Sequence, residues 1–188
     1  MKVNVRRINE WDAPAVLKIY APYAESGFAP EQAAPTLPEM IQRIDKYTYG
    51  YGWLVCELDN VPAGFCYVTE HAQAAQNPFE LDFYIYVKPE FQRRRVGTAL
   101  CSLLFRILEY GNRRTLFAQL PVWNETAAAF LRAQNFAPAA LPQNGEILCL
   151  RRALSPEDAT AERITKPYLI EGKAYEQARE QAQNLVKI

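Results

Sequence analysis

The N-terminal part of the chain carries apolar residues at helical spacing. Asp12 is an N-cap residue type and precedes apolar positions that recur every three to four residues up to Tyr23. Thr36 and Glu39 form a capping box before a second helical stretch. Residues 26–38 contain three prolines and a glycine, so we expect a loop between two helices.

After these helices the apolar residues alternate with a period of two, which is typical of β-strands. An Asp59-Asn60 pair between two alternating runs is a hairpin turn signal. From Glu80 to Val87 the odd-numbered residues are apolar and share one face, which leaves Glu80 and Asp82 on the other. The predicted strands cover residues 3–8, 53–58, 63–69 and 80–87.

The second half of the chain alternates helices with short strands. Apolar residues from Val96 to Leu108 form a strong helical stripe that ends at Gly111. Further predicted elements are a strand at 116–120, a helix capped by Asn124 and stopped by a left-handed Asn135, and a strand pair within 136–151. This order predicts a mixed α/β (α+β) fold, in which helices cover both faces of a mixed sheet.

Composition narrows the class of protein. The length of 188 residues and the polar composition after Arg152 predict one domain over 1–152 and a partly helical appendage over 153–188. The 21 basic residues balance the 21 acidic ones, which argues against a nucleic-acid binder. Neither a signal peptide nor a membrane-spanning apolar run is evident, so we expect a cytoplasmic protein with no membrane partner.

Cysteine and histidine usage argues against a metal site. The four cysteines lie in apolar strand or helix patterns without metal-ligand spacing, so we expect buried, reduced thiols. The single histidine, His71, is expected in a surface loop.

Residues 92–100 read QRRRVGTAL and lie between a predicted strand and the apolar helix. A loop at a helix N-terminus directs free backbone N–H groups at one point, where the helix dipole favours an anion. Gly97 permits a close backbone approach and Thr98 adds a hydroxyl donor. The spacing matches neither the P-loop nor the dinucleotide fingerprint. A solvated helix start and a basic nucleic-acid patch are the competing interpretations.

Several segments in the same order resemble the GNAT superfamily of acyl-CoA N-acyltransferases, and most of all its phosphinothricin-acetyltransferase-like subgroup. They are KIYAPYAESGFAPEQAAPTLPEM, GWLVCELDNVPAGFCYV, LDFYIYVKPEFQRRRVGTAL and PVWNETAAAFLRAQNF. The resemblance covers residues 1 to about 152. It implies a single GNAT-like domain with a mostly antiparallel central sheet. It also implies acetyl-CoA as cosubstrate and direct acetyl transfer to a primary amine of a small molecule.

The resemblance also implies roles for individual residues. The backbone at the end of the 80–87 strand would flank the pantetheine and thioester where two strands splay apart. The following loop and helix start would hold the pyrophosphate, and Asn124 would contact the cofactor. Asp82 stands where the subgroup has a glutamate proposed as general base, and Glu80 is the alternative base. The implied cofactor-binding residues are Ile85, Tyr86, Val87, Arg93, Arg94, Arg95, Val96, Gly97, Thr98 and Asn124.

The chain departs from the family pattern at several positions. Arg95 replaces the first loop glycine, which is compatible with the cradle if its φ is negative. Leu131 stands where relatives have a Tyr or His, and Asn135 replaces a glycine. The segment HAQAAQNPFE lacks the subgroup's arginines, which argues against phosphinothricin as the acceptor. A catalytically weak or inactive CoA-binding module is therefore the alternative function, and a homodimer is a possibility left open.

Overall fold

The computed structural model describes residues 1–71, 77–139, 145–156, 158–160, 162–166 and 172–187. Its strands are β1 (Val3–Arg7), β2 (Trp53–Leu58), β3 (Val61–Glu70), β4 (Glu80–Val87), β5 (Thr115–Pro121), β6 (Ala137–Pro138) and β7 (Ile147–Ala153). Its α-helices are α1 (Ala13–Glu25), α2 (Leu37–Thr48), α3 (Val96–Tyr110), α4 (Glu125–Ala133) and α5 (Lys173–Asn184). Two 3-10 turns, η1 (Glu10–Asp12) and η2 (Pro89–Phe91), precede α1 and α3.

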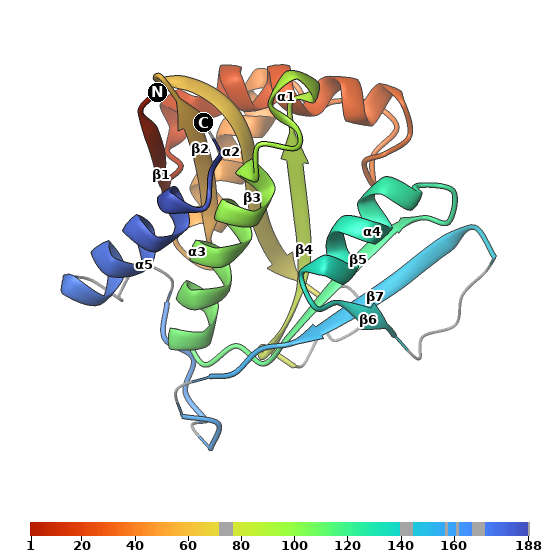
Figure 1. Ribbon diagram of the computed structural model, residues 1–188. Coiled ribbons are helices and arrows are strands. Elements are labelled where there is room, and N and C mark those ends of the chain that lie inside the picture. The colour runs from red at the N-terminus through yellow and green to blue at the C-terminus, as the bar shows by residue number, and fades with distance from the viewer. Residues whose placement is uncertain (72–76, 140–144, 157, 161, 167–171, 188) are drawn as a thin grey trace.

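The strands form one seven-stranded sheet in the order β1-β2-β3-β4-β5-β7-β6 (Figure 1). Neighbouring strands are antiparallel except β4 and β5, which run parallel. A parallel pair needs a crossover, and α3 supplies it. The predicted mixed, mostly antiparallel sheet is therefore confirmed.

Helices cover both faces of the sheet, as the sequence predicts. One core cluster joins α1 and α2 to residues of β2, β3 and β4 that include Trp53 and Tyr86. The other joins α3, α4 and α5 to the opposite face and includes Leu81 and Phe83. The period of two in β4 sorts its side chains between these two cores, so Asp82 lies on the α1–α2 face.

The turn between β2 and β3 has the conformation that its sequence predicts. Asp59 (φ 50°) and Asn60 (φ 64°) both adopt left-handed backbone angles. Two successive left-handed residues make a type I′ turn, whose twist matches that of the flanking strands. Local sequence chemistry thus fixes the register of this hairpin.

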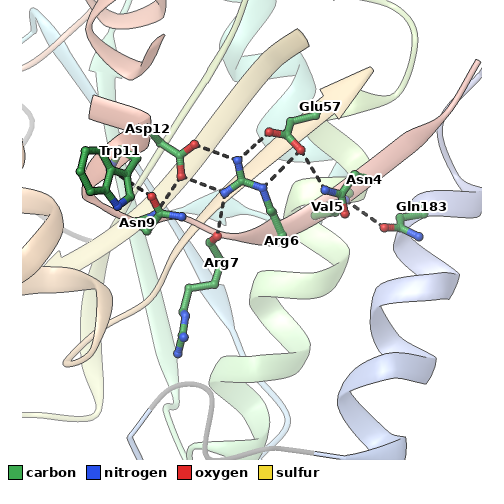
Figure 2. Close-up of polar contacts among 9 residues, drawn as sticks. All are labelled: Asn4, Val5, Arg6, Arg7, Asn9, Trp11, Asp12, Glu57 and Gln183. Carbon is green, nitrogen blue, oxygen red and sulfur yellow. Dashed lines mark hydrogen bonds and ion pairs between the residues drawn. The ribbon is translucent and has the colours of Figure 1, made fainter. Parts of the chain in front are cut away.

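A buried ion-pair network attaches β1 to β2 and to the start of α1 (Figure 2). Arg6 binds Asp12 through both terminal nitrogens at 2.8 Å and binds Glu57 at 2.6 Å. The hydrogen bonds to Asp12 raise the pKa of the Arg6 guanidinium above its usual value, against the effect of burial, and Glu57 adds to the rise. Asp12 precedes α1 as predicted, but its side chain caps no helix N–H of α1, because it binds Arg6 and the N–H of Asn9 instead.

The C-terminal helix packs on the face of the sheet that α3 covers. Ala178, Ala182 and Val186 are buried in the same core cluster as α3. Gln183 accepts a hydrogen bond from the backbone N–H of Val5 at 3.0 Å, which ties α5 to the outer edge of β1 (Figure 2). In Figure 1, α5 lies beside α3, and both chain termini lie near the same end of these helices.

Helix α3 ends where predicted, although the reason differs. Gly111 has φ −76°, and Asn112, with φ 60°, takes the left-handed position. A Cβ at Gly111 would lie 2.8 Å from the carbonyl oxygen of Thr165. The glycine therefore admits the returning C-terminal segment, whose Thr165 N–H binds the Gly111 carbonyl at 3.2 Å.

The four cysteines are free and buried, as the sequence predicts. Burial raises the pKa of the Cys56 thiol to about 12, which keeps it protonated and unreactive near neutral pH. Among the described residues, no helix is long and apolar enough to cross a membrane.

Gly64 marks a close approach between β3 and β4, and its substitution tests that packing. A Cβ there would lie 2.8 Å from the Tyr86 carbonyl oxygen and 3.1 Å from a Val87 methyl group. We expect Gly64→Ala to lower the free energy of unfolding by about 1–3 kcal/mol in urea titrations, because the two strands must separate. Gly50→Ala is the control, since its nearest contact is an ordinary 3.8 Å. Equal stability of the two variants would contradict this reading of the sheet.

Candidate functional site

The site begins where β4 and β5 stop pairing. The parallel ladder joins Glu80 to Thr115, Leu81 to Leu116 and Asp82 to Phe117. Beyond this rung both strands continue, β4 to Val87 and β5 to Pro121, without pairing to each other. Figure 1 shows the two strands diverging from their shared end. The divergence leaves one edge of β4 open in the middle of the sheet.

The open edge of β4 carries unpaired backbone groups. On its other edge β4 pairs with β3 as far as Val87, and Lys88 N–H binds the Ala63 carbonyl at 2.9 Å. Alternation along the ladder then directs the N–H and C=O groups of Ile85 and Val87 toward the opening. The Val87 carbonyl indeed accepts from the Tyr23 hydroxyl of α1 rather than from β3. The strand end therefore offers the N–H groups of Ile85 and Val87 to a bound molecule.

Tyr86 faces away from this edge. Its ring is buried among aromatic residues on the α1–α2 face, with Tyr20 at 5.0 Å between centroids. Burial raises the pKa of the Tyr86 hydroxyl well above its usual value. Its side chain therefore serves the core, and only its backbone lies along the site.

The arginine run forms a sharply turned loop before α3. Arg93 (φ 63°) and Arg95 (φ 61°) both adopt left-handed backbone angles. The condition of a negative φ at Arg95 is therefore not met, and this arginine takes the conformation that a glycine would adopt most easily. The turn is needed because η2 leads directly into α3 within four residues.

The start of α3 presents free donors at this loop. Ala99 N–H binds the Arg95 carbonyl at 3.0 Å, so the N–H groups of Val96, Gly97 and Thr98 precede the first intrahelical bond. The side chain of Arg95, the N-cap residue, makes no capping hydrogen bond to these N–H groups. The side chains of Arg93, Arg94 and Arg95 are exposed around them. Backbone donors and the positive end of the helix dipole thus lie at the start of α3, next to three exposed arginines, an arrangement that suits an anion.

The C-terminal segment supports this loop directly. The carbonyl of Arg94 accepts a hydrogen bond from the N–H of Lys187 at 2.9 Å. The Arg94 guanidinium lies 5.9 Å from the centre of the Phe91 ring and 3.9 Å from the Met1 sulfur. Both chain ends therefore hold the loop from outside the domain core.

Gly97 has a packing role that the sequence did not reveal. A Cβ at Gly97 would lie 3.0 Å from Phe130 Cζ of α4 and 3.5 Å from Ile85 Cδ1. Its bare backbone therefore allows α3 to approach the rings and strand that border the opening. Val96 is fully buried and anchors the helix start in the core.

The residues of α4 divide between capping and packing. Asn124 caps the helix, since its side-chain oxygen accepts from Ala127 N–H at 3.1 Å. This bond leaves the amide nitrogen as a donor near the end of β5. Leu131 is buried in the core, so α4 offers no proton donor at that position. Asn135 has φ 63°, which confirms the predicted left-handed stop.

Asp82 lies at the apex of the divergence and binds His71. Asp82 is 6% exposed and belongs to the last paired rung with Phe117. The His71 Nδ1 lies 2.7 Å from Asp82 Oδ1, and the imidazole stacks on Phe117 with ring centroids 4.1 Å apart. The expectation that His71 is a surface loop residue is wrong, because this residue is only 4% exposed. His71 directly follows β3, and its ring contacts both Asp82 of β4 and Phe117 of β5.

The Asp82 carboxylate affects the pKa of two other side chains on the same face. Burial and, second, the Asp82 carboxylate raise the pKa of Tyr84 to about 12. The same two causes, in the same order, raise the pKa of the Cys149 thiol. Glu80 lies on this face two residues before Asp82 and is half-buried. The structure thus brings together both candidate bases, and it adds His71, which sequence reasoning had missed.

Two exposed aromatic residues meet at the open end of the strands. Phe28 follows α1 and Trp123 follows β5, and their ring centroids are 4.8 Å apart. These segments are separated by about half the sequence but lie on the two sides of the divergence. They form an apolar rim beside the site.

In the described parts of the chain, no group of three or more His, Cys, Asp or Glu side chains is arranged to hold a metal ion.

The mixed sheet that opens between β4 and β5, with helices on both faces, is an acetyltransferase fold. The chain belongs to the GNAT family of acetyltransferases, whose model matches residues 13–136. The chain is 31% identical over 132 residues to phosphinothricin N-acetyltransferase of Alcaligenes faecalis, covering 69% of this chain and 67% of the relative. It is 24% identical over 135 residues to the Streptomyces viridochromogenes enzyme of the same name, covering 71% and 74%.

Solved structures support the same fold. A phosphinothricin acetyltransferase from Sinorhizobium meliloti, crystallised in complex with acetyl-CoA, superimposes with a TM-score of 0.74. The alignment covers 89% of this chain and 96% of that one, at 22% sequence identity.

The support that α5 gives to the domain can be tested by a buried charge. Ala182 is fully buried against the α3 core, whereas Ala174 of the same helix is exposed. We expect Ala182→Asp to lower the free energy of unfolding by roughly 2–4 kcal/mol, because an unpaired carboxylate enters an apolar contact. Ala174→Asp should change it by less than about 0.5 kcal/mol. If thermal denaturation shows equal stability for both, α5 does not pack on the domain in solution.

Proposed function

We propose that the protein transfers the acetyl group of acetyl-CoA directly to a primary amine of a small molecule, within a ternary complex. The observation that carries this proposal is the divergence of β4 and β5 beyond Asp82, with the α3 start and its arginine loop beside it. A long, narrow molecule with an anionic group at one end and a carbonyl at the other matches this arrangement. The family assignment and the acetyl-CoA complex of a relative support the same choice.

The residues present suit the cofactor part by part. The N–H groups of Val96, Gly97 and Thr98 would bind the pyrophosphate, with Arg93 to Arg95 around it. The backbone of Ile85 to Val87 would flank the pantetheine and the thioester, and the Asn124 amide would contact the cofactor from α4. Acetyl-CoA supplies an activated thioester carbonyl, so this chain needs neither a nucleophile nor a metal ion.

The β4 backbone and the Asp82 carboxylate would have separate roles in the transfer. A strand N–H of Ile85 or Val87 is fixed in place and would donate to the thioester oxygen as negative charge develops there. Attack requires a neutral amine, so Asp82 would accept a proton from the acceptor directly or through a water molecule. Glu80 is the alternative base. Because Leu131 is buried and apolar, the leaving thiolate would take its proton from solvent.

The acceptor is proposed as a small-molecule amine that enters from the α1–α2 side. The exposed Phe28 and Trp123 rings rim this entrance. The named relatives act on phosphinothricin, but this chain lacks the arginines that the subgroup carries before the catalytic strand. A broad panel of primary amines is therefore the appropriate screen.

The anion cradle can be tested with an acidic substitution at Gly97. We expect acetyl-CoA to bind in calorimetric titrations with a dissociation constant in the micromolar range, about −8 kcal/mol. Gly97→Glu should weaken this binding at least roughly a hundredfold, because its side chain would collide with Phe130 and displace the helix start that donates the N–H groups, and it would add a negative charge there. Gln177→Glu adds the same charge at an exposed position of α5 and should leave the affinity unchanged. Absence of binding to the unsubstituted protein would rule out the cradle.

The base can be assigned by comparing two isosteric variants. We expect Asp82→Asn to lower kcat by about 10²- to 10⁴-fold and to leave acetyl-CoA affinity unchanged, because only the proton acceptor is lost. Glu80→Gln should lower kcat less than tenfold. A larger loss in Glu80→Gln would transfer the role to Glu80. Acetyl-CoA binding without transfer to any amine of the panel would instead favour the inactive CoA-binding module.

A further inference from the structure

The single histidine of the chain bridges the two strands at the point where they part. His71 binds Asp82 of β4 through Nδ1 at 2.7 Å and stacks on Phe117 of β5, with ring planes 11° apart. Asp82 and Phe117 are the last rung of the β4–β5 ladder. The imidazole thus joins both sides of the apex, although the chain reaches it from a third strand, β3.

We propose that His71 and Asp82 act as one unit, in which the imidazole holds the carboxylate in the orientation that takes the proton of the acceptor amine. This inference rests on the proposed acetyl transfer and on Asp82 as its base. His71 is a positioning residue in this assignment, since it acts on the acceptor through Asp82.

The stacking explains how the orientation is achieved. An imidazole can rotate about the bond between Cβ and Cγ, but contact with the flat Phe117 ring fixes the plane of the imidazole. With the plane fixed, Nδ1 points at Asp82 Oδ1 and holds that oxygen at the apex. Both side chains are less than one-tenth exposed, so this hydrogen bond is strong and little competed by water. A base held in one rotamer loses less entropy when the acceptor arrives.

The proton balance of the transfer needs one acceptor. The acceptor nitrogen forms a bond to the thioester carbon and loses a proton, while the carbon–sulfur bond breaks and its electron pair leaves with the sulfur. The lost proton passes to the Asp82 carboxylate, which His71 holds through Nδ1 at 2.7 Å.

Other titratable groups lie on the same face as His71 and Asp82. Glu80 lies on the Asp82 face of β4, and Arg151 of β7 is exposed opposite Phe117. Tyr84 and Cys149 have raised pKa values, so both remain neutral near neutral pH.

Two substitutions separate the stacked ring from the polar contact. His71→Phe keeps an aromatic ring on Phe117 and removes the hydrogen bond to Asp82. His71→Asn places an amide nitrogen where Nδ1 stands, so it keeps a donor to Asp82 but removes the stacked ring. Both variants are measured for kcat and for the KM and dissociation constant of acetyl-CoA.

We expect His71→Phe to lower kcat at least roughly a hundredfold with acetyl-CoA affinity unchanged. His71→Asn should keep kcat within about tenfold of that of the unsubstituted protein, because its amide restores the donor to Asp82. A merely structural histidine would give the two variants the same kcat.

The outcomes distinguish this inference from the function on which it rests. If the unsubstituted protein transfers no acetyl group to any amine of the panel, the proposed function fails and the inference fails with it. If it is active, and either kcat of His71→Phe stays within about twofold or His71→Asn loses as much kcat as His71→Phe, only the His71–Asp82 unit is overturned. Because His71 is the only histidine, the downfield Nδ1–H resonance in proton NMR checks the contact independently. It should vanish in Asp82→Ala.

Discussion

The loss of pairing between β4 and β5 beyond Asp82 and Phe117 is the constraint on which the rest of the site depends. A parallel pair that continued to the strand ends would satisfy every backbone group and leave nothing for a ligand. Because it stops, Ile85 and Val87 keep their N–H groups for a bound molecule, and α3 and α4 face the same opening. The cost of the lost ladder is moderated by the Tyr23 hydroxyl and the Gln92 amide, which donate to the Val87 carbonyl. This interruption in the core of the sheet supplies the opening in which the proposed acetyl-CoA would lie.

The loop before α3 shows a second departure from the most stable local structure. A left-handed conformation costs a non-glycine residue roughly 1 kcal/mol, and this loop contains two such residues, Arg93 and Arg95. Packing of Val96 below and the hydrogen bond from Lys187 to Arg94 hold the turn in place. Strain that persists beside free helix N–H groups is typical of a site whose backbone is preorganised for a ligand. The arginines then contribute cationic side chains at positions where glycines would contribute none.

Local patterns predicted most of the fold, because periodicity and turn chemistry act over a few residues. The alternation in β4, the Asp59-Asn60 turn, the capping box at Thr36 and the left-handed Asn135 were all predicted correctly. The failures concern side-chain contacts that periodicity and turn chemistry do not encode. Asp12 binds Arg6 of the preceding strand in place of the helix N–H groups, and His71 is buried against Asp82 and Phe117, which no local pattern connects to it. One signal was available for His71: the β3–β4 register places the residue after Glu70 beside the start of β4, close to the candidate base.

The same reasoning explains why the C-terminal segment escaped assignment from its sequence. Its apolar stripe is thin and reads as a weak surface helix, since small alanines bury little area. Packing against α3 stabilises this helix, because the small side chains of Ala178 and Ala182 allow α5 to lie close to α3. Gln183 then reaches the free edge of β1. The Gln183 side chain takes up the Val5 N–H that another strand could otherwise bind. Four residues later, just beyond α5, the Lys187 N–H donates to the Arg94 carbonyl, so the same end of the C-terminal segment connects the outer edge of the sheet to the loop before α3.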